Sequence, residues 1–134
     1  MNQSEIDAIV RRALDEDLPD ITSDAIFDAD ERGSAFFLAK ASGVLAGLAF
    51  AEATFRALDP SAEIVSVVGD GAQIAPGDEI AEVRGSVRAL LAGERTALNL
   101  VQRASGIATM TWRYVEAVDG TGATIYDTRK TVPG

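Results

Sequence analysis

The sequence contains no cysteine and no histidine. The absence of cysteine excludes disulfide bonds and thiolate chemistry, and it fits a reducing compartment, so we expect a cytoplasmic protein. The absence of histidine removes the most common general base and the most common zinc ligand. Any chemistry is therefore left to acidic and basic side chains and to backbone groups.

Positive charge is scarce as well. The 12 Lys and Arg residues stand against 21 Asp and Glu residues, which gives a net charge of −9. Nucleic acids and anionic membranes select basic surfaces, so this balance argues against both as partners. It does not exclude a small anionic ligand, because a local cluster of basic residues would be the one attractive place on a negative surface.

Long apolar runs are also absent. No stretch reaches the length of a membrane-spanning helix, and the N-terminal residues lack the basic and then apolar pattern of a signal peptide. We therefore expect no membrane partner. With 134 residues, the chain is long enough for one domain with a hydrophobic core.

The pattern of apolar residues predicts an α+β fold, with helices on one side of a few short strands. A first helix is expected to be capped by Ser4 and to end near Asp17, because Leu18-Pro19 disfavours further helix. Residues 20–24 are rich in side chains that bond their own backbone, which predicts an ordered turn. Strands are expected over 33–41, 43–47, 62–68 and 79–86, with a helix over 48–58.

Two turns in this part, at 69–71 and 75–78, resemble those of the β-hammerhead in lipoyl and biotinyl carrier domains. Such a carrier needs a modifiable lysine on a hairpin soon after the following strand. The corresponding stretch, 82–88, contains no lysine. This absence argues against a carrier function and leaves a shared local fold.

Residues 90–106 predict a helix with two different faces. On a helical wheel, Asn99, Gln102 and Arg103 lie beside Arg95, and most apolar residues lie opposite. The ordinary interpretation is an amphipathic helix with a solvated polar face. Glu94 falls inside the apolar arc, where a carboxylate is costly unless it is paired, so we expect it to have a cationic or backbone N–H partner.

The last part of the chain predicts a change of structure. Gly106 permits a break, after which a second helix is expected over 107–118 and a short strand over 123–127. The basic pair Arg129-Lys130 follows that strand directly. Barrels of alternating strands and helices place their ligands at this end of a strand.

Three separated motifs, in the same order, closely resemble those of quinolinate phosphoribosyltransferase, the carboxylating nicotinate-nucleotide pyrophosphorylase of NAD synthesis. They are Gly-Glu-Arg-Thr-Ala-Leu-Asn at 93–99, Gln-Arg-Ala-Ser-Gly-Ile-Ala-Thr at 102–109 and Asp-Thr-Arg-Lys-Thr-Val-Pro-Gly at 127–134. Shorter matches lie at 16–18, 20–23 and 43–47. The resemblance spans essentially the whole chain.

The resemblance implies an N-terminal α/β sandwich, hammerhead-like in part, followed by linking helices and the first strand of an α/β barrel. We expect residues 1–106 to form the sandwich domain, including the motif helix. Residues 107–134 are expected to form the linking helix and the first barrel strand, with the rest of the barrel absent from this chain.

The same resemblance implies roles for four residues and a homodimer with sites shared between subunits. Arg95 matches an arginine that reaches into the neighbouring subunit and holds a quinolinate carboxylate. Arg129 matches a carboxylate-binding arginine of the barrel. Thr128 and Lys130 match its neighbours, with Lys130 on the phosphoribosyl pyrophosphate side. Catalytic residues and metal ligands are not assigned to this segment, and Mg²⁺ is expected to accompany phosphoribosyl pyrophosphate with ligands mostly outside the chain.

The implied activity is a transfer of a phosphoribosyl group to quinolinate, which yields nicotinate mononucleotide, CO₂ and pyrophosphate. Planar guanidinium groups suit the two carboxylates of quinolinate, and a lysine suits a phosphate. Family chains are longer, so we expect the 134-residue chain alone to be inactive. The alternatives are another phosphoribosyltransferase of this fold, acting on nicotinate or associated with molybdenum transport, and a non-catalytic dimerisation module.

Overall fold

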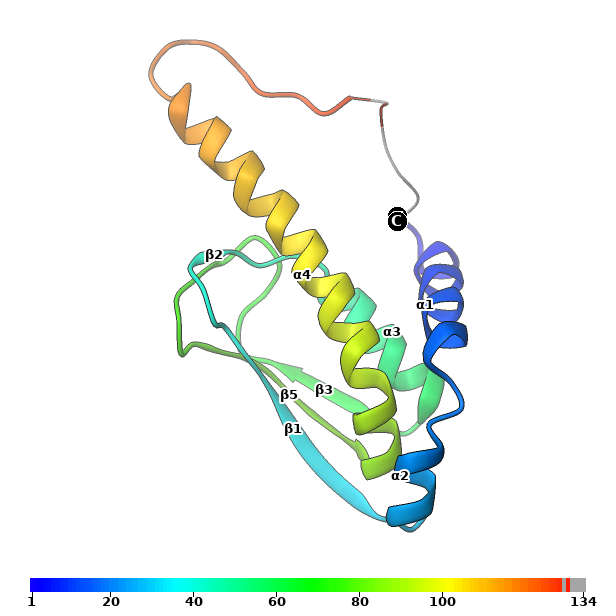
Figure 1. The fold of residues 1–134 in the computed structure, drawn as a ribbon. Coiled ribbons are helices and arrows are strands. Elements are labelled where there is room, and N and C mark those ends of the chain that lie inside the picture. The colour runs from blue at the N-terminus through cyan, green and yellow to red at the C-terminus, as the bar shows by residue number, and fades with distance from the viewer. Residues whose placement is uncertain (129, 131–134) are drawn as a thin grey trace.

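Nine helices and strands account for most of the computed structural model, which describes residues 1–128 and 130 (Figure 1). Helices and short antiparallel strands are both present and do not alternate regularly along the chain, which agrees with the α+β prediction. The elements are α1 (Gln3–Asp17), α2 (Ile21–Ile26), β1 (Arg32–Leu38), β2 (Gly43–Val44), α3 (Leu48–Leu58), β3 (Glu63–Ser66), β4 (Gln73–Ile74), β5 (Glu79–Ser86) and α4 (Val87–Ala117).

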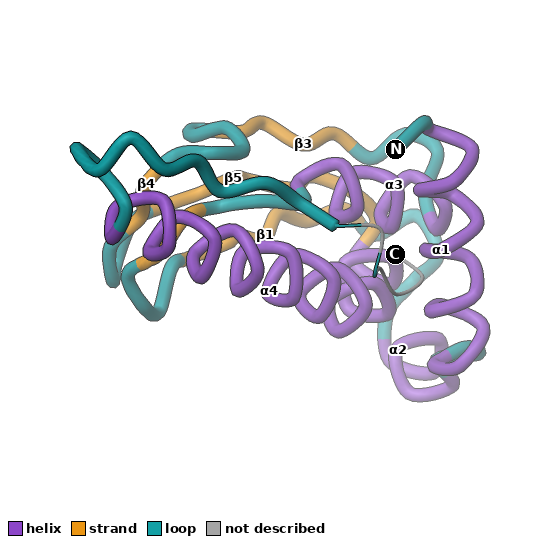
Figure 2. Tube along the Cα trace, turned by 90° about the horizontal axis from the view of Figure 1, so that it is seen from above, coloured by secondary structure: helices purple, strands orange, loops and turns teal. Residues whose placement is uncertain are grey.

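The main sheet has three antiparallel strands in the order β1-β5-β3. Its register aligns Phe36 of β1 and Val65 of β3 with Glu82 of the central strand. The helix α4 runs along this sheet, while α1, α2 and α3 gather at one end (Figure 2). A second, two-stranded sheet pairs β2 with β4. Helices cover one face of the main sheet, and Phe36 and Val65 on the other face are exposed.

The hydrophobic core lies between the main sheet and the helices α3 and α4. Phe37 of β1 meets Phe55 of α3 edge to face, with ring centroids 6.2 Å apart. Val83, Ala81 and Ala97 in the same cluster are fully buried. A smaller cluster packs α1 against α3. Burial of apolar surface in these clusters fixes α4 to the sheet on one side and leaves its other side open.

The predictions for α3 and β5 are confirmed to the residue, and the strands β1, β2 and β3 are shorter than predicted. Two predictions near the N-terminus are wrong. Asn2, not Ser4, caps α1, because its side chain accepts from the Glu5 N–H while the Glu5 carboxylate accepts from the Asn2 N–H. Residues 20–24 begin the helix α2 because Asp20 caps it by accepting from the Ser23 N–H.

The predicted break at Gly106 is also wrong, since α4 runs for 31 residues without interruption. Contacts on both sides of this glycine hold the helix to β2 and the residues after it. The Thr109 hydroxyl accepts from the Val44 N–H at 2.8 Å, and the Ser105 hydroxyl accepts from the Ala46 N–H at 3.0 Å. A glycine inside a helix costs about 1 kcal/mol, which these contacts offset.

The structure also contradicts the strand predicted over 123–127. Residues 123–128 have no regular structure and pair with no strand of the described chain. An extended segment needs a neighbouring strand to satisfy its backbone groups, and none of β1–β5 lies beside it. The predicted domain boundary at 106 stays a prediction, and α4 crosses it as a single helix.

Candidate functional site

The polar face of α4 is exposed to solvent because the opposite face packs tightly against α3. A methyl group at Gly93 would come within 3.0 Å of Leu58 Cδ1 and 3.1 Å of Phe55 Cε1, so the glycine permits this close approach. Thr96 and Ala97 on the same face are buried. This packing turns Arg95 away from the core.

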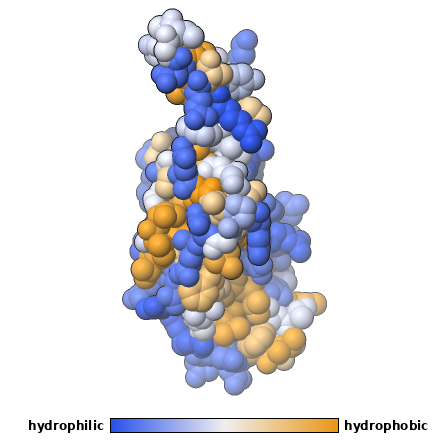
Figure 3. Space-filling view, turned by 90° about the vertical axis from the view of Figure 1, so that its left-hand side faces the viewer, coloured by the Kyte–Doolittle hydropathy of each residue, from blue (hydrophilic) through white to orange (hydrophobic). Residues whose placement is uncertain are grey.

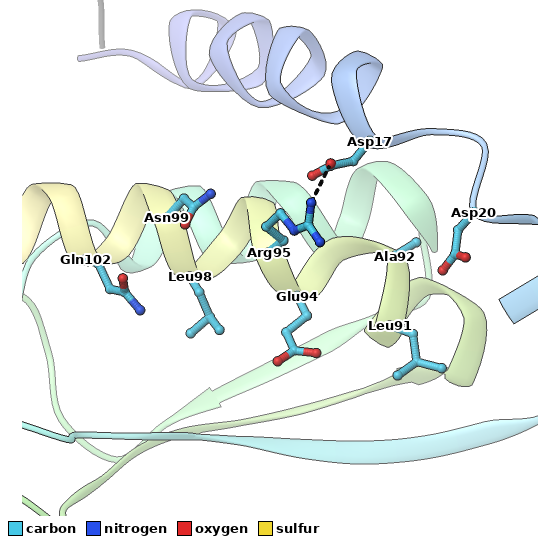
Figure 4. Close-up of a pocket in the computed structure, with 9 residues that line it drawn as sticks. All are labelled: Asp17, Asp20, Leu91, Ala92, Glu94, Arg95, Leu98, Asn99 and Gln102. Atoms are coloured by element: carbon cyan, nitrogen blue, oxygen red, sulfur yellow. Dashed lines mark hydrogen bonds and ion pairs between the residues drawn. The ribbon is translucent and has the colours of Figure 1, made fainter. Parts of the chain in front are cut away.

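A cavity of about 520 Å³ lies beside this polar face (Figure 4). The side chains around it come from α4, from the end of α1 and from the link between α1 and α2. Arg95, Asn99 and Gln102 line it together, which confirms the helical-wheel prediction for these residues. The full lining is Asp17, Asp20, Leu91, Ala92, Glu94, Arg95, Leu98, Asn99 and Gln102.

Arg95 is the basic residue of this cavity. Its side chain is 76% exposed, and its Nη1 lies 3.3 Å from Oδ1 of Asp17. Figure 4 shows the guanidinium group directed toward the end of α1. The arrangement places a positively charged, planar hydrogen-bond donor at an open cavity, where it can bind a carboxylate or a phosphate.

The two other acidic residues of the cavity have different surroundings. Asp20 is engaged with Ser23, whose hydroxyl and N–H hydrogen bonds lower the pKa of the Asp20 carboxyl below its usual value. Glu94 is exposed and has no hydrogen bond or ion pair with residues 1–128 or 130. The position predicted for Glu94 inside the buried face is therefore wrong, because that face is centred on Gly93 and Ala97 and Glu94 lies beside it. A partner for Glu94 on a second subunit stays a prediction.

The C-terminal candidates lie apart from this cavity. Thr128 and Lys130 are exposed and do not line it. The Lys130 N–H donates to the Thr128 hydroxyl at 3.2 Å. Arg129 lies outside the described residues. The structure thus gathers Arg95 with Asn99 and Gln102 and does not bring Thr128 or Lys130 to the same cavity.

Two acidic residues that sequence reasoning did not select support α4. Asp17, the partner of Arg95, is 78 positions away in the sequence. The short match at 16–18 to the resembled family is the sequence signal that includes it. Asp59 is buried at the C-terminal end of α3, where it accepts hydrogen bonds from Arg32 at 2.8 Å and from the Ser86 N–H at 2.9 Å. No local pattern marks such contacts, because their partners lie far along the chain.

Asp59 joins the start of β1 to the start of α4. The Ser61 hydroxyl and the Ser86 N–H, together with Arg32, lower the pKa of the Asp59 carboxyl from 3.8 to about 2. Ser86 in turn caps α4 by accepting from the Ala89 N–H. The carboxylate therefore anchors the helix that carries Arg95.

Metal binding and membrane insertion find no support in the described residues. No three Asp or Glu side chains of residues 1–128 and 130 come together in a way that could hold a metal ion. None of the described helices is both long enough and apolar enough to cross a bilayer. The described acidic residues therefore form no metal site made by protein side chains alone.

Residues 20–105 match a family described as quinolinate phosphoribosyl transferase, N-terminal domain. A protein of Synechocystis named as a probable carboxylating nicotinate-nucleotide pyrophosphorylase is 47% identical over 103 residues, which cover 77% of this chain and 35% of the relative. A Bacillus subtilis protein of the same name is 40% identical over 136 residues, which cover the whole of this chain and 47% of the relative.

Solved structures agree with these sequence matches. The crystal structure of NadC from Streptococcus pyogenes matches with a TM-score of 0.91 and 39% identity, over 99% of this chain and 49% of that one. The nicotinate-nucleotide pyrophosphorylase of Francisella tularensis matches with a TM-score of 0.91 and 32% identity, over 99% and 48% of the two chains. The chain thus spans less than half the length of each of these proteins.

Proposed function

Because the chain belongs to the quinolinate phosphoribosyltransferase family, we propose that it is the N-terminal part of an enzyme of NAD synthesis. That enzyme joins quinolinate to phosphoribosyl pyrophosphate and releases nicotinate mononucleotide, CO₂ and pyrophosphate. The observation that carries the proposal is the exposed Arg95 guanidinium at an open cavity, on a helix that the core holds in place.

The chain contributes substrate binding in this proposal. Quinolinate carries two carboxylates, and the Arg95 guanidinium can meet one of them through two parallel hydrogen bonds. Thr128, Arg129 and Lys130 complete the substrate site, with Arg129 on a carboxylate and Lys130 on the phosphoribosyl pyrophosphate side. These residues bind and orient the substrates, and none of them transfers a proton.

The reaction makes few chemical demands on this segment. The pyridine nitrogen forms a bond to C1 of the ribose as the bond to pyrophosphate breaks, through an oxocarbenium-like state. The ring nitrogen is then cationic, so it accepts the electron pair that the bond to the departing CO₂ leaves behind. Mg²⁺ neutralises charge on pyrophosphate when it is bound.

A homodimer with shared sites is part of the proposal. The far half of α4 exposes Ile107, Met110, Tyr114 and Val115, and apolar residues gather in patches on the face that Figure 3 shows. Contiguous exposed apolar surface is typical of an interaction site. This surface supports contact of α4 with a second polypeptide, so that Arg95 serves the partner's site. A cytoplasmic location belongs to the same proposal.

The test begins by reading the coding DNA past codon 134 and expressing the protein that it encodes. We expect this protein to release pyrophosphate from quinolinate and Mg-phosphoribosyl pyrophosphate. Arg95→Ala should lower kcat/KM for quinolinate about 30-fold or more, because a charged hydrogen-bond partner of a carboxylate is worth roughly 2 kcal/mol.

Arg12→Ala is the control for this variant. It removes the same charge from an exposed position on α1, outside the cavity around Arg95 and away from the exposed apolar half of α4. We expect its kinetics to match those of the unchanged enzyme. A protein that prefers nicotinate, or one that dimerises without turning over any pyridine acid, would contradict the proposal.

A further inference from the structure

The contact between Asp17 and Arg95 joins the last residue of α1 to the exposed face of α4 (Figure 4). The two partners are held unequally. The Asp17 side chain is 29% exposed and the Arg95 side chain 76%. The better-buried carboxylate therefore acts as the fixed point, and the arginine is the group that it restrains.

The contact leaves most of the guanidinium available. Arginine has five N–H donors in a planar fork, and the contact with Asp17 uses Nη1 alone. The edge formed by Nε and Nη2 has no hydrogen bond with residues 1–128 or 130. A carboxylate can bind that edge through two parallel hydrogen bonds. Asp17 thus holds the group without occupying the edge that suits a ligand.

The other two acidic residues of the cavity, Asp20 and Glu94, do not contact the Arg95 guanidinium. Asp20 is engaged as the cap of α2 with Ser23, and Glu94 makes no contact with Arg95. In the described part of the chain, Asp17 is the carboxylate that reaches the guanidinium.

We propose that Asp17 is a positioning residue that restricts Arg95 to conformers in which its Nε–Nη2 edge faces a ligand carboxylate. The inference rests on the proposed function of Arg95. A free, exposed arginine loses side-chain entropy when it binds a ligand. A carboxylate that has already limited its rotamers reduces that loss, and so it increases affinity for the ligand.

The charge of Asp17 has the opposite effect. It offsets part of the positive charge of Arg95 and repels an anionic ligand. Both side chains contact water, where such interactions are weak and screened by salt. Asp17 touches Nη1 directly, whereas a ligand on the Nε–Nη2 edge lies farther from Asp17, so screening weakens the repulsion of the ligand more than the contact that holds Arg95. We therefore expect the positioning effect to dominate, and its loss to weaken the binding of quinolinate. If charge dominated, removing Asp17 would strengthen that binding.

The experiment compares Asp17→Asn with Asp15→Asn in the full-length enzyme. Asp15 is an exposed residue of the same helix and has no ion pair with residues 1–128 or 130, so both variants remove the same charge from the same helix end. Asp17→Asn should raise KM for quinolinate about threefold, as expected for an exposed ion pair, with kcat unchanged. Asp15→Asn should change neither constant. An unchanged or lowered KM in Asp17→Asn would overturn the proposal.

A double variant separates positioning from a general structural effect. In the Arg95→Ala background, Asp17→Asn should raise KM no further, because its effect passes through Arg95. A further rise would overturn the proposal.

A measurement on the 134-residue chain is independent of the proposed activity. NMR relaxation of the Arg95 Nε–H group should show greater mobility in Asp17→Asn and no change in Asp15→Asn. Equal mobility in both variants would reject positioning by Asp17. Absence of pyrophosphate release by the unchanged full-length protein would instead reject the proposed function.

Discussion

Replacement of Asp59 by the isosteric asparagine should lower the stability of the fold, because its carboxylate accepts several hydrogen bonds. Asp59→Asn keeps the side-chain volume but places an amide donor among the donors of Arg32, Ser61 and Ser86. We expect the free energy of unfolding at pH 7 to fall by about 2 kcal/mol. Urea denaturation measures this change. Asp15→Asn, at an exposed position, should shift it by less than about 0.5 kcal/mol.

The contribution of Asp59 should also depend on pH. Its pKa is about 2 in the folded chain and 3.8 ordinarily. A lowered pKa means that the stabilisation is fully present above the unfolded value and is lost as pH falls toward 2. The stability difference between the unchanged chain and Asp59→Asn should therefore shrink between pH 5 and pH 2. A difference that is the same at both ends of this range would show that the carboxylate is not the stabilising form.

The helix α4 depends on contacts that its own sequence does not reveal. Thr109→Val removes the hydroxyl that accepts from the Val44 N–H. An unsatisfied, partly buried N–H costs about 1 to 2 kcal/mol, so we expect a loss of that size in unfolding free energy. Hydrogen exchange at the Val44 amide should also become faster.

Thr111→Val is the control for this helix. The Thr111 hydroxyl donates only to the Ile107 carbonyl of its own helix, at an exposed position. The substitution makes the same change in side-chain chemistry two residues away, so it should leave exchange at Val44 unchanged. Faster exchange in both variants would mean that the helix, and not its contact with β2, is what had weakened.

Local patterns predicted α3 and β5 well because both are bounded by clear stop signals, Asp59-Pro60 after the helix and the turn at 75–78 before the strand. Local patterns failed at Gly106, because the contacts of Thr109 with β2 and of Ser105 with Ala46, some 60 residues earlier, hold the helix together there. Only such non-local contacts explain why α4 stays continuous.

The candidate site was predictable only as far as local helical periodicity defines it. Helical periodicity alone places Arg95, Asn99, Gln102 and Arg103 on one face. The cavity confirms this grouping for the first three residues, and Arg103 does not line it. The helical wheel placed Glu94 on the buried face, whereas Glu94 is exposed, because the packing of α3 decides which face of α4 is buried. The contact with Asp17 could not be predicted, since it requires the folded arrangement of α1 and α4.

For the whole molecule, the central expectation is that residues 1–134 fold but do not catalyse. The purified chain, mixed with quinolinate and Mg-phosphoribosyl pyrophosphate, should release no pyrophosphate above background. The reason is that the chain covers less than half the length of these relatives. Release above background would show that this segment holds a complete site.

Shared sites can be tested by mixing two inactive full-length proteins, Arg95→Ala and Arg129→Ala. If Arg95 serves the partner's site, each mixed dimer regains one intact site. Random pairing makes half of the dimers mixed, so about a quarter of the unchanged activity should return. Co-expression of the two variants provides the measurement. Activity that stays at the level of the separate variants would place Arg95 and Arg129 in the same subunit's site.

Because α4 is one continuous helix, the position of Arg95 depends on every contact that holds the helix to the rest of the fold. Arg95 is the ninth residue of this 31-residue helix and lies about 12 Å from its start, so a tilt of about five degrees there moves the Arg95 backbone by about 1 Å. Asp59 holds the N-terminal end of α4 by accepting from the Ser86 N–H, and Thr109 holds the middle of α4 by accepting from the Val44 N–H. Substitutions at these remote supports can therefore alter ligand geometry without touching a ligand, and natural variation in substrate affinity need not map to the residues that bind substrate.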